Sequence, residues 1–247
     1  MKILVCITKA PDTTTKIAFT DNDTQFNETG VQWIINPYDE WYALVRALEL
    51  KEAGVASAVH LITVGKADTE PVIRKALALG GDEAIRIDSD SNDPFAIASQ
   101  IAHYAANEKY DLILTGKESI DYNNSSTGAM IAELLDMPFI THVSKLDIEN
   151  NSARTNREIE GGEETSSCTL PLVISCQKGM AEARIPNMRG IMAARTKPLK
   201  VVTPDAVSAW TTTVGYELPA QKAGVKMIDP EHMDELVRLL HEEAKVI

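Results

Sequence analysis

The residues best suited to chemistry form a cluster of small polar side chains, Asn123-Asn124-Ser125-Ser126-Thr127-Gly128. They follow Asp111–Thr115, an apolar run typical of a strand in a parallel sheet, and they open a helical pattern over Ser126–Leu135. The start of a helix has unpaired backbone N–H groups and partial positive charge. Hydroxyl groups there add donors, so the cluster is suited to a phosphate. The residues alone leave open that Asn124 or Ser125 only caps the helix.

Other reactive residue types form no catalytic pattern. The histidines are scattered, at His60, His103, His142, His232 and His241. Neither a Ser-His-Asp arrangement nor paired carboxylates are visible. The cysteines Cys6, Cys168 and Cys176 lack metal-site spacing and cannot all pair, which favours a reducing compartment. The sequence therefore predicts neither catalytic residues nor a metal site.

The composition is that of a globular protein with an excess of acid. The 247 residues are 44% hydrophobic, and Lys+Arg 24 against Asp+Glu 36 gives a net charge of −12. This charge argues against a nucleic-acid or anionic-membrane surface. Apolar runs are shorter than the roughly 18 residues of a membrane span. No signal peptide precedes the strand pattern at Lys2–Ile7. We therefore expect no nucleic-acid partner and no membrane insertion.

Strand and helix patterns alternate along the first part of the chain. Apolar runs predict strands at Lys2–Thr8, Ala58–Val64, Glu83–Ile87 and Asp111–Thr115. A polar residue followed by proline suits a helix start, and glycine suits a helix end. Such signals predict helices over 36–53, 70–79 and 93–107, the first capped by Asn36. Between the first strand and this helix, we expect Lys16–Phe19 and Gly30–Ile34 to form a small hairpin.

This alternation predicts an α/β fold with a doubly wound, mainly parallel sheet. With the strand order 3-2-1-4-5, the chain reverses direction between strands one and four, and ligands bind beyond the strand ends at such a switch point. The loops Thr8–Asp12 and Gly116–Ser125 would face each other there, with Asn36 and Val64-Gly65 nearby. We expect a nucleotide site in this position.

The pattern changes after Leu135. Short β-like segments lie at Thr141–Ile148, Ala153–Ile159, Glu164–Leu170 and Leu172–Cys176. A basic loop follows over 179–200, then a long extended arm over 203–226, and a helix from Asp229 to near Val246. A long arm of this kind is either disordered or wraps a partner. We expect residues 1–200 to form the α/β domain with a β-rich extension and a docking loop, and residues 201–247 to form the C-terminal arm.

Several of these segments resemble the β subunit of electron transfer flavoprotein. The most specific is Arg157–Glu164 followed by Leu170–Ser175, a basic residue, two acids and small residues before a proline and a buried strand. Further matching segments are Lys2–Asp12, Asn36-Pro37-Tyr38, Ile73–Gly80, Gly116-Lys117, Ile120-Asp121 and Ala183–Lys197. The likeness covers nearly the whole chain.

The resemblance implies a fold of the adenine nucleotide alpha hydrolase type and an electron carrier rather than an enzyme. It implies a heterodimer whose α subunit holds most of a redox FAD, while this chain binds AMP at the switch point. Its arm would wrap the α subunit. An acyl-CoA or other flavin dehydrogenase would supply electrons, and a quinone oxidoreductase would accept them. The location would be a bacterial cytoplasm, or the mitochondrial matrix in a eukaryote.

The resemblance also assigns roles to residues. AMP would contact Cys6, Asn36, Pro37, Tyr38, Asp39, Thr63, Val64, Gly116, Asn123, Asn124, Ser125, Ser126 and Thr127. Tyr38 and Thr13 would lie near the FAD, and Glu158 would pair with an arginine on the mobile FAD domain. Dehydrogenase docking would involve Arg184, Ile185, Met188, Arg189 and Ile191, with Met188 in an exposed turn as the apolar anchor.

Three alternatives remain. A bifurcating branch of the family holds a second FAD in this crevice, but its loop reads like Asp-Thr-x-x-Val-Gly-Pro where Thr127-Gly128-Ala129 stands here, which favours AMP. A stand-alone module resembling universal stress proteins would carry a second glycine where Ser119 stands. The Ser-Gly-Gly-x-Asp-Ser loop of ATP-cleaving synthetases of related fold is absent.

Overall fold

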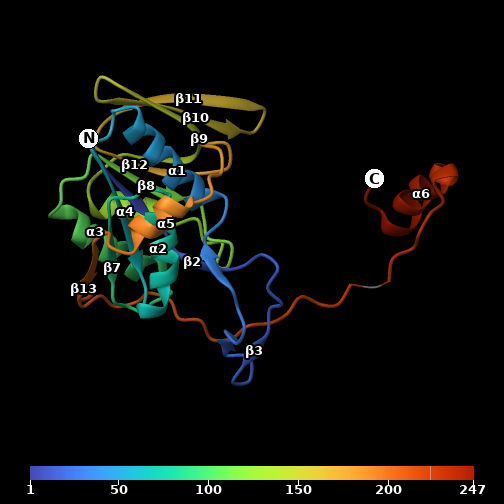
Figure 1. Ribbon diagram of the computed structural model, residues 1–247. Coiled ribbons are helices and arrows are strands. Elements are labelled where there is room, and N and C mark those ends of the chain that lie inside the picture. The colour runs from blue at the N-terminus through green and yellow to red at the C-terminus, as the bar shows by residue number, and fades with distance from the viewer. Residues whose placement is uncertain (223) are drawn as a thin grey trace.

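A nine-stranded sheet forms the centre of the protein in the computed structural model, which describes residues 1–222 and 224–247 (Figure 1). The strand order is β11-β10-β9-β12-β8-β1-β6-β7-β13. The parallel strands are β1 (Lys2–Cys6), β6 (Ala58–Val64), β7 (Glu83–Ile87), β8 (Leu112–Gly116), β9 (Phe139–Glu149), β12 (Leu172–Cys176) and β13 (Leu199–Val202). Antiparallel pairing adds β10 (Ser152–Ile159) and β11 (Gly162–Thr169) at one edge.

Helices cover both faces of this sheet. The covering helices are α1 (Asp39–Glu52), α2 (Glu70–Leu79), α3 (Pro94–Ala106) and α4 (Thr127–Leu134). A further helix, α5 (Met188–Ala194), packs on α2, and α6 (Met233–Leu239) lies near the C-terminus. Alternation along β1 directs Ile3 and Val5 into the core shared with α1 and α2. Leu4 and Cys6 enter the opposite core, shared with α3 and α4. Burial on both faces explains why β1 is almost entirely apolar.

The predicted strand order is confirmed. Strands one to four of the prediction correspond to β1, β6, β7 and β8. The further buried strand expected at Leu172–Cys176 is β12 and takes the fifth place, so the observed order β7-β6-β1-β8-β12 is 3-2-1-4-5. The helix start at Asp93-Pro94 is also confirmed, because the Asp93 carboxylate accepts a hydrogen bond from the Ala96 N–H at 2.7 Å. The switch point therefore lies between β1 and β8, as expected.

The predicted hairpin is wrong. Strand β5 (Trp33–Ile35) pairs with β2 (Lys9–Pro11), and β3 (Phe19–Thr20) pairs with β4 (Gln25–Phe26). The three residues Asp21–Asp23 all have positive φ and form a turn of their own. This turn joins β3 to β4, so β5 pairs instead with β2, which follows β1 in the chain.

The predicted cap of α1 is also wrong. The helix begins at Asp39, its N-cap residue is Tyr38 with φ 69°, and no side chain caps it. Asn36 is fully buried instead, and its amide donates to the Glu118 carbonyl at 2.8 Å and accepts from the Ile120 N–H at 3.1 Å. Its side chain therefore holds the loop after β8 in place, because it binds one carbonyl and one N–H group of that loop.

The C-terminal segment consists of two parts. After β13, which spans the expected boundary at residue 200, the chain passes along the body to β3 and then continues to α6, which lies apart from the body (Figure 1). A short 3-10 turn, Pro230–His232, precedes α6, and a π-helical turn, Leu240–Ala244, follows it. Within the described ranges, no helix combines the length and apolar composition that a membrane crossing requires.

Candidate functional site

A cleft of about 960 Å³ opens at the carboxyl ends of β1, β6 and β8. Five residues expected in the nucleotide site line it: Cys6, Val64, Gly116, Asn124 and Thr127. They come from three strand ends, from the loop before α4 and from the first residue of α4, which the strand order brings together. A cleft of this size at a switch point is suited to a small-molecule ligand.

The amino terminus of α4 opens into this cleft. Its N-cap residue, Ser126, makes no side-chain capping bond, whereas Thr127 and Gly128 line the cleft. The first N–H groups of this helix therefore remain available to an acceptor. Among the described residues, no group of three or more His, Cys, Asp or Glu side chains is placed to hold a metal ion.

The opposite wall of the cleft contains a buried carboxyl group that the sequence analysis missed. Glu40 accepts hydrogen bonds from the Thr8 backbone N–H at 2.6 Å and from the Thr8 hydroxyl at 2.9 Å. Burial raises its pKa to about 8, although these donors act in the opposite direction. From sequence, a glutamate in the first turn of a helix indicates only a favourable charge at the positive helix end.

Other predicted contacts lie around the cleft rather than in its lining. Ser125 donates to the Glu118 carboxylate at 2.9 Å, and Glu118 also pairs with Lys117 at 2.9 Å. Thr63 is buried and donates to the Ile7 carbonyl at 3.0 Å. The remaining predicted residues outside the lining are Asn36, Pro37, Tyr38, Asp39, Asn123 and Ser126.

Glycine permits the close approach of two elements beneath this cleft. A Cβ added at Gly116 would lie 2.7 Å from Cγ of Glu40 and 3.1 Å from Cβ of Asp39. The first turn of α1 therefore packs directly on the end of β8. A side chain at Gly116 would separate the two walls of the site.

The residues expected near FAD lie on the surface. Tyr38 and Thr13 are both exposed. Glu158 is exposed on the β10–β11 hairpin, directly opposite Glu163 in the register. All three side chains are accessible to a second chain.

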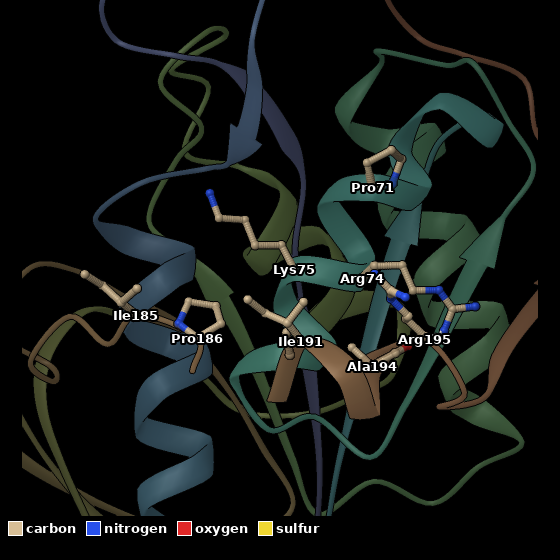
Figure 2. Close-up of a pocket in the computed structure, with 9 residues that line it drawn as sticks. Pro71, Arg74, Lys75, Ile185, Pro186, Ile191, Ala194 and Arg195 are labelled. Carbon is tan, nitrogen blue, oxygen red and sulfur yellow. Dashed lines mark hydrogen bonds between the residues drawn. The ribbon is translucent and has the colours of Figure 1, made fainter. Parts of the chain in front are cut away.

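Two of the expected docking residues, Ile185 and Ile191, line a second cavity, of about 650 Å³, between α2 and α5 (Figure 2). Its lining residues are Pro71, Arg74, Lys75, Ala78, Ile185, Pro186, Ile191, Ala194 and Arg195. Gly190 allows this packing, since a Cβ there would collide with the Ala78 carbonyl oxygen. Arg74 ties α5 to α2 by donating to the Ala194 and Lys197 carbonyls at 2.8 and 2.7 Å.

The predicted exposed turn at Met188 is instead the start of α5, and Asn187 caps it by accepting from the Gly190 N–H at 2.8 Å. Met188 is 74% exposed, but Ile185 just before the helix is 91% exposed. Arg184 forms an ion pair with Glu52 of α1 at 2.7 Å, whereas Arg189 and Ile191 are exposed. Apolar and basic side chains therefore share this surface.

The fold and the cleft define a doubly wound α/β protein with a ligand-sized site at its switch point. A family model described as "Electron transfer flavoprotein domain" matches residues 23–207. The chain is 37% identical to the electron transfer flavoprotein subunit beta of Bacillus subtilis, with all of both chains covered. It is 34% identical to the mitochondrial subunit beta of Oryza sativa subsp. japonica, with both chains fully covered. The Homo sapiens subunit beta is 32% identical, with 100% of this chain and 99% of the relative covered.

The chain therefore belongs to the electron transfer flavoprotein family, among the β subunits. Family membership makes it a flavoprotein component of electron transport with an α-subunit partner.

Proposed function

We propose that this chain binds AMP in the cleft and forms a heterodimer with an α subunit that holds most of the FAD. The observation that carries the proposal is the uncapped start of α4, which opens into the cleft at the switch point. Thr127 adds a hydroxyl group at the same place. The phosphate of AMP would bind there, while Cys6 and Val64 would flank the rest of the nucleotide.

A second FAD in the same cleft is the other candidate. AMP is a small ligand, whereas the cleft volume of about 960 Å³ lies at the upper end of the usual range for ligand sites. The volume is therefore the observation that favours FAD. The loop sequence Thr127-Gly128-Ala129 favours AMP. Identification of the nucleotide released on denaturation decides between the two.

The exposed residues on the surface support a role beside a second chain. FAD, when bound by the α subunit, supplies the electron-accepting and electron-donating chemistry. We propose that Tyr38 and Thr13 cover one side of it and that Glu158 pairs with an arginine of the FAD domain. The chain would itself contribute no catalytic residue.

A flavin dehydrogenase, such as an acyl-CoA dehydrogenase, would dock at α5. Ile185 is the most exposed of the three apolar candidates, Ile185, Met188 and Ile191, so we propose it as the leading contact, with Met188 beside it. The surrounding arginines would attract an acidic partner surface and raise the association rate. Electrons would pass on to a quinone oxidoreductase, in a bacterial cytoplasm or a mitochondrial matrix.

The proposed phosphate position at the start of α4 is tested by adding a negative charge there. Ser126→Glu places a carboxylate beside the expected phosphate, so we expect the AMP content of the purified heterodimer to fall at least tenfold, the effect of about 1.4 kcal/mol. Glutamine has nearly the same shape as glutamate but no charge, so Ser126→Gln is the matched control. Chromatography of the nucleotide released on denaturation gives the content. Equal AMP in both variants would contradict the proposed phosphate position.

A further inference from the structure

One wall of the cleft comes from a part of the chain far from the others in sequence. Residues 209–216, here called the strap, follow β13 and cross the carboxyl edge of the sheet toward β3 (Figure 1). Five of them line the cleft: Ala209, Thr211, Thr212, Thr213 and Tyr216. Three successive threonines present hydroxyl groups that can both donate and accept hydrogen bonds.

The strap is tied to the start of α3 at one end. The Trp210 ring stacks on Phe95, with ring centroids 3.6 Å apart and an angle of 8° between the planes. The Thr211 N–H and hydroxyl both donate to Oδ2 of Asp93, at 2.9 and 2.6 Å. Asp93 is buried, and its other oxygen caps α3, so the strap is anchored to a rigid element.

The other end is tied to the β3–β4 ribbon. Tyr216 stacks on Phe19, with centroids 4.9 Å apart, and its backbone N–H donates to the Asp23 carbonyl at 2.7 Å. Phe19 itself lines the cleft. The strap is therefore held at both ends, and its middle faces the cleft.

These contacts lie outside the hydrophobic core. Trp210 is 68% exposed despite its stacking contact. Segments with few buried apolar contacts open locally without global unfolding. Opening of the strap would consequently break only these contacts and leave the sheet folded.

We propose that the strap is a further part of the nucleotide site and that it retains the ligand by closing the cleft over it. The inference rests on the proposed binding of AMP. Thr211, Thr212 and Thr213 form the polar side of the enclosure, and the two aromatic stacks hold the strap closed. Release of AMP requires the strap to open, so weakening its ties raises the release rate more than it changes the association rate.

The test measures release of labelled AMP from the heterodimer after addition of excess unlabelled AMP. Trp210→Ala removes one stack, and Thr211→Val removes the hydroxyl bond to Asp93 while keeping the size of the side chain. We expect each variant to release AMP about tenfold faster. Each loses one contact that holds the strap closed, and the free energy of such a contact corresponds to a change of about tenfold. Val214→Ala is the matched control, since Val214 is within the strap, 88% exposed and not part of the lining.

The outcomes are distinct. Unchanged release from both variants, with folding verified by circular dichroism, would overturn the strap inference while AMP binding stands. Equally fast release from Val214→Ala would also overturn it, because the effect would not depend on the closing contacts. Wild-type heterodimer that contains no AMP would overturn the proposed function before any variant is compared.

Discussion

At the scale of single residues, Glu40 shows how burial gives one carboxyl group unusual properties. Its side chain is enclosed between the end of β1 and the start of α1, and the Thr8 N–H and hydroxyl both donate to it. Loss of water destabilises the charged form more than its hydrogen bonds stabilise it, so the pKa rises to about 8. Burial also raises the pKa of the neighbouring Cys6 thiol, with the charge of Glu40 as a lesser cause.

This raised pKa predicts a pH dependence of stability. Between the ordinary glutamate pKa near 4.5 and the folded value of about 8, the folded protein holds a proton that the unfolded chain releases. The free energy of unfolding therefore falls as pH rises through this window. Glu40→Gln should remove that slope, which amounts to about 1.4 kcal/mol for each pKa unit.

Urea unfolding of wild type and Glu40→Gln at several pH values between 5 and 8 measures the effect. Glu133→Gln, which removes an exposed carboxylate on α4, is the control. Parallel pH profiles for wild type and Glu40→Gln would show that Glu40 titrates as an ordinary carboxylate.

At the scale of elements, α5 presents the surface expected to meet the dehydrogenase. Its packing on α2 depends on Gly190 and on Arg74, which leaves Ile185 and Met188 directed outward beside basic residues. Contiguous exposed apolar side chains with a charged rim are typical of a protein-binding site.

The docking surface predicts a specific defect in electron uptake. Ile185→Asp replaces the most exposed apolar side chain with a charge, so we expect the KM for the heterodimer in a dehydrogenase assay to rise about tenfold or more. FAD content should not change, because we propose that the α subunit holds most of the FAD and that Tyr38 and Thr13, which are not on α5, cover it. Met188→Ala should have the same effect to a smaller extent.

Leu134→Asp, at an exposed position on α4, is the control for added surface charge. Normal electron uptake by Ile185→Asp would exclude Ile185 as an anchor. Loss of FAD from the variant would instead indicate a structural role.

At the scale of the whole molecule, α6 lies apart from the body (Figure 1). Together with the chain on either side of it, this helix exposes apolar side chains, including Leu218, Val225, Met227, Val237 and Ile247. Such exposure on a chain of otherwise ordinary composition indicates a surface that a partner covers.

Deletion of residues 217–247 should therefore abolish association with the α subunit and leave the α/β body folded, because the sheet and both cores lie before residue 217. Size-exclusion chromatography of the co-expressed chains measures association, and circular dichroism measures folding. Val237→Asp is the milder variant. A truncated chain that still forms a stable heterodimer would contradict this role.

Two sites where a polar residue precedes proline show how well local sequence predicts the cap of a helix. Asp93-Pro94 starts a helix as predicted, because the Asp93 carboxylate finds the N–H of Ala96 three residues later. Asn36-Pro37 reads alike in sequence, but Asn36 is drawn to the loop after β8, more than 80 residues away. The same local pattern has two outcomes because the loop after β8 competes with the start of α1 for the Asn36 side chain.

The sequence by itself determined the alternation of strands and helices and the doubly wound α/β class, because hydrophobic periodicity and short connections leave few arrangements open. Its motifs, such as Arg157–Glu164, determined the family resemblance, and the structure confirmed the order 3-2-1-4-5. Only the tertiary structure decided that Glu40 is buried beside Thr8 and that Thr211 reaches Asp93 across 118 positions. The physical reason is that such contacts depend on how segments far apart in the sequence pack together. A local pattern of residues does not predict which distant segment will lie beside it.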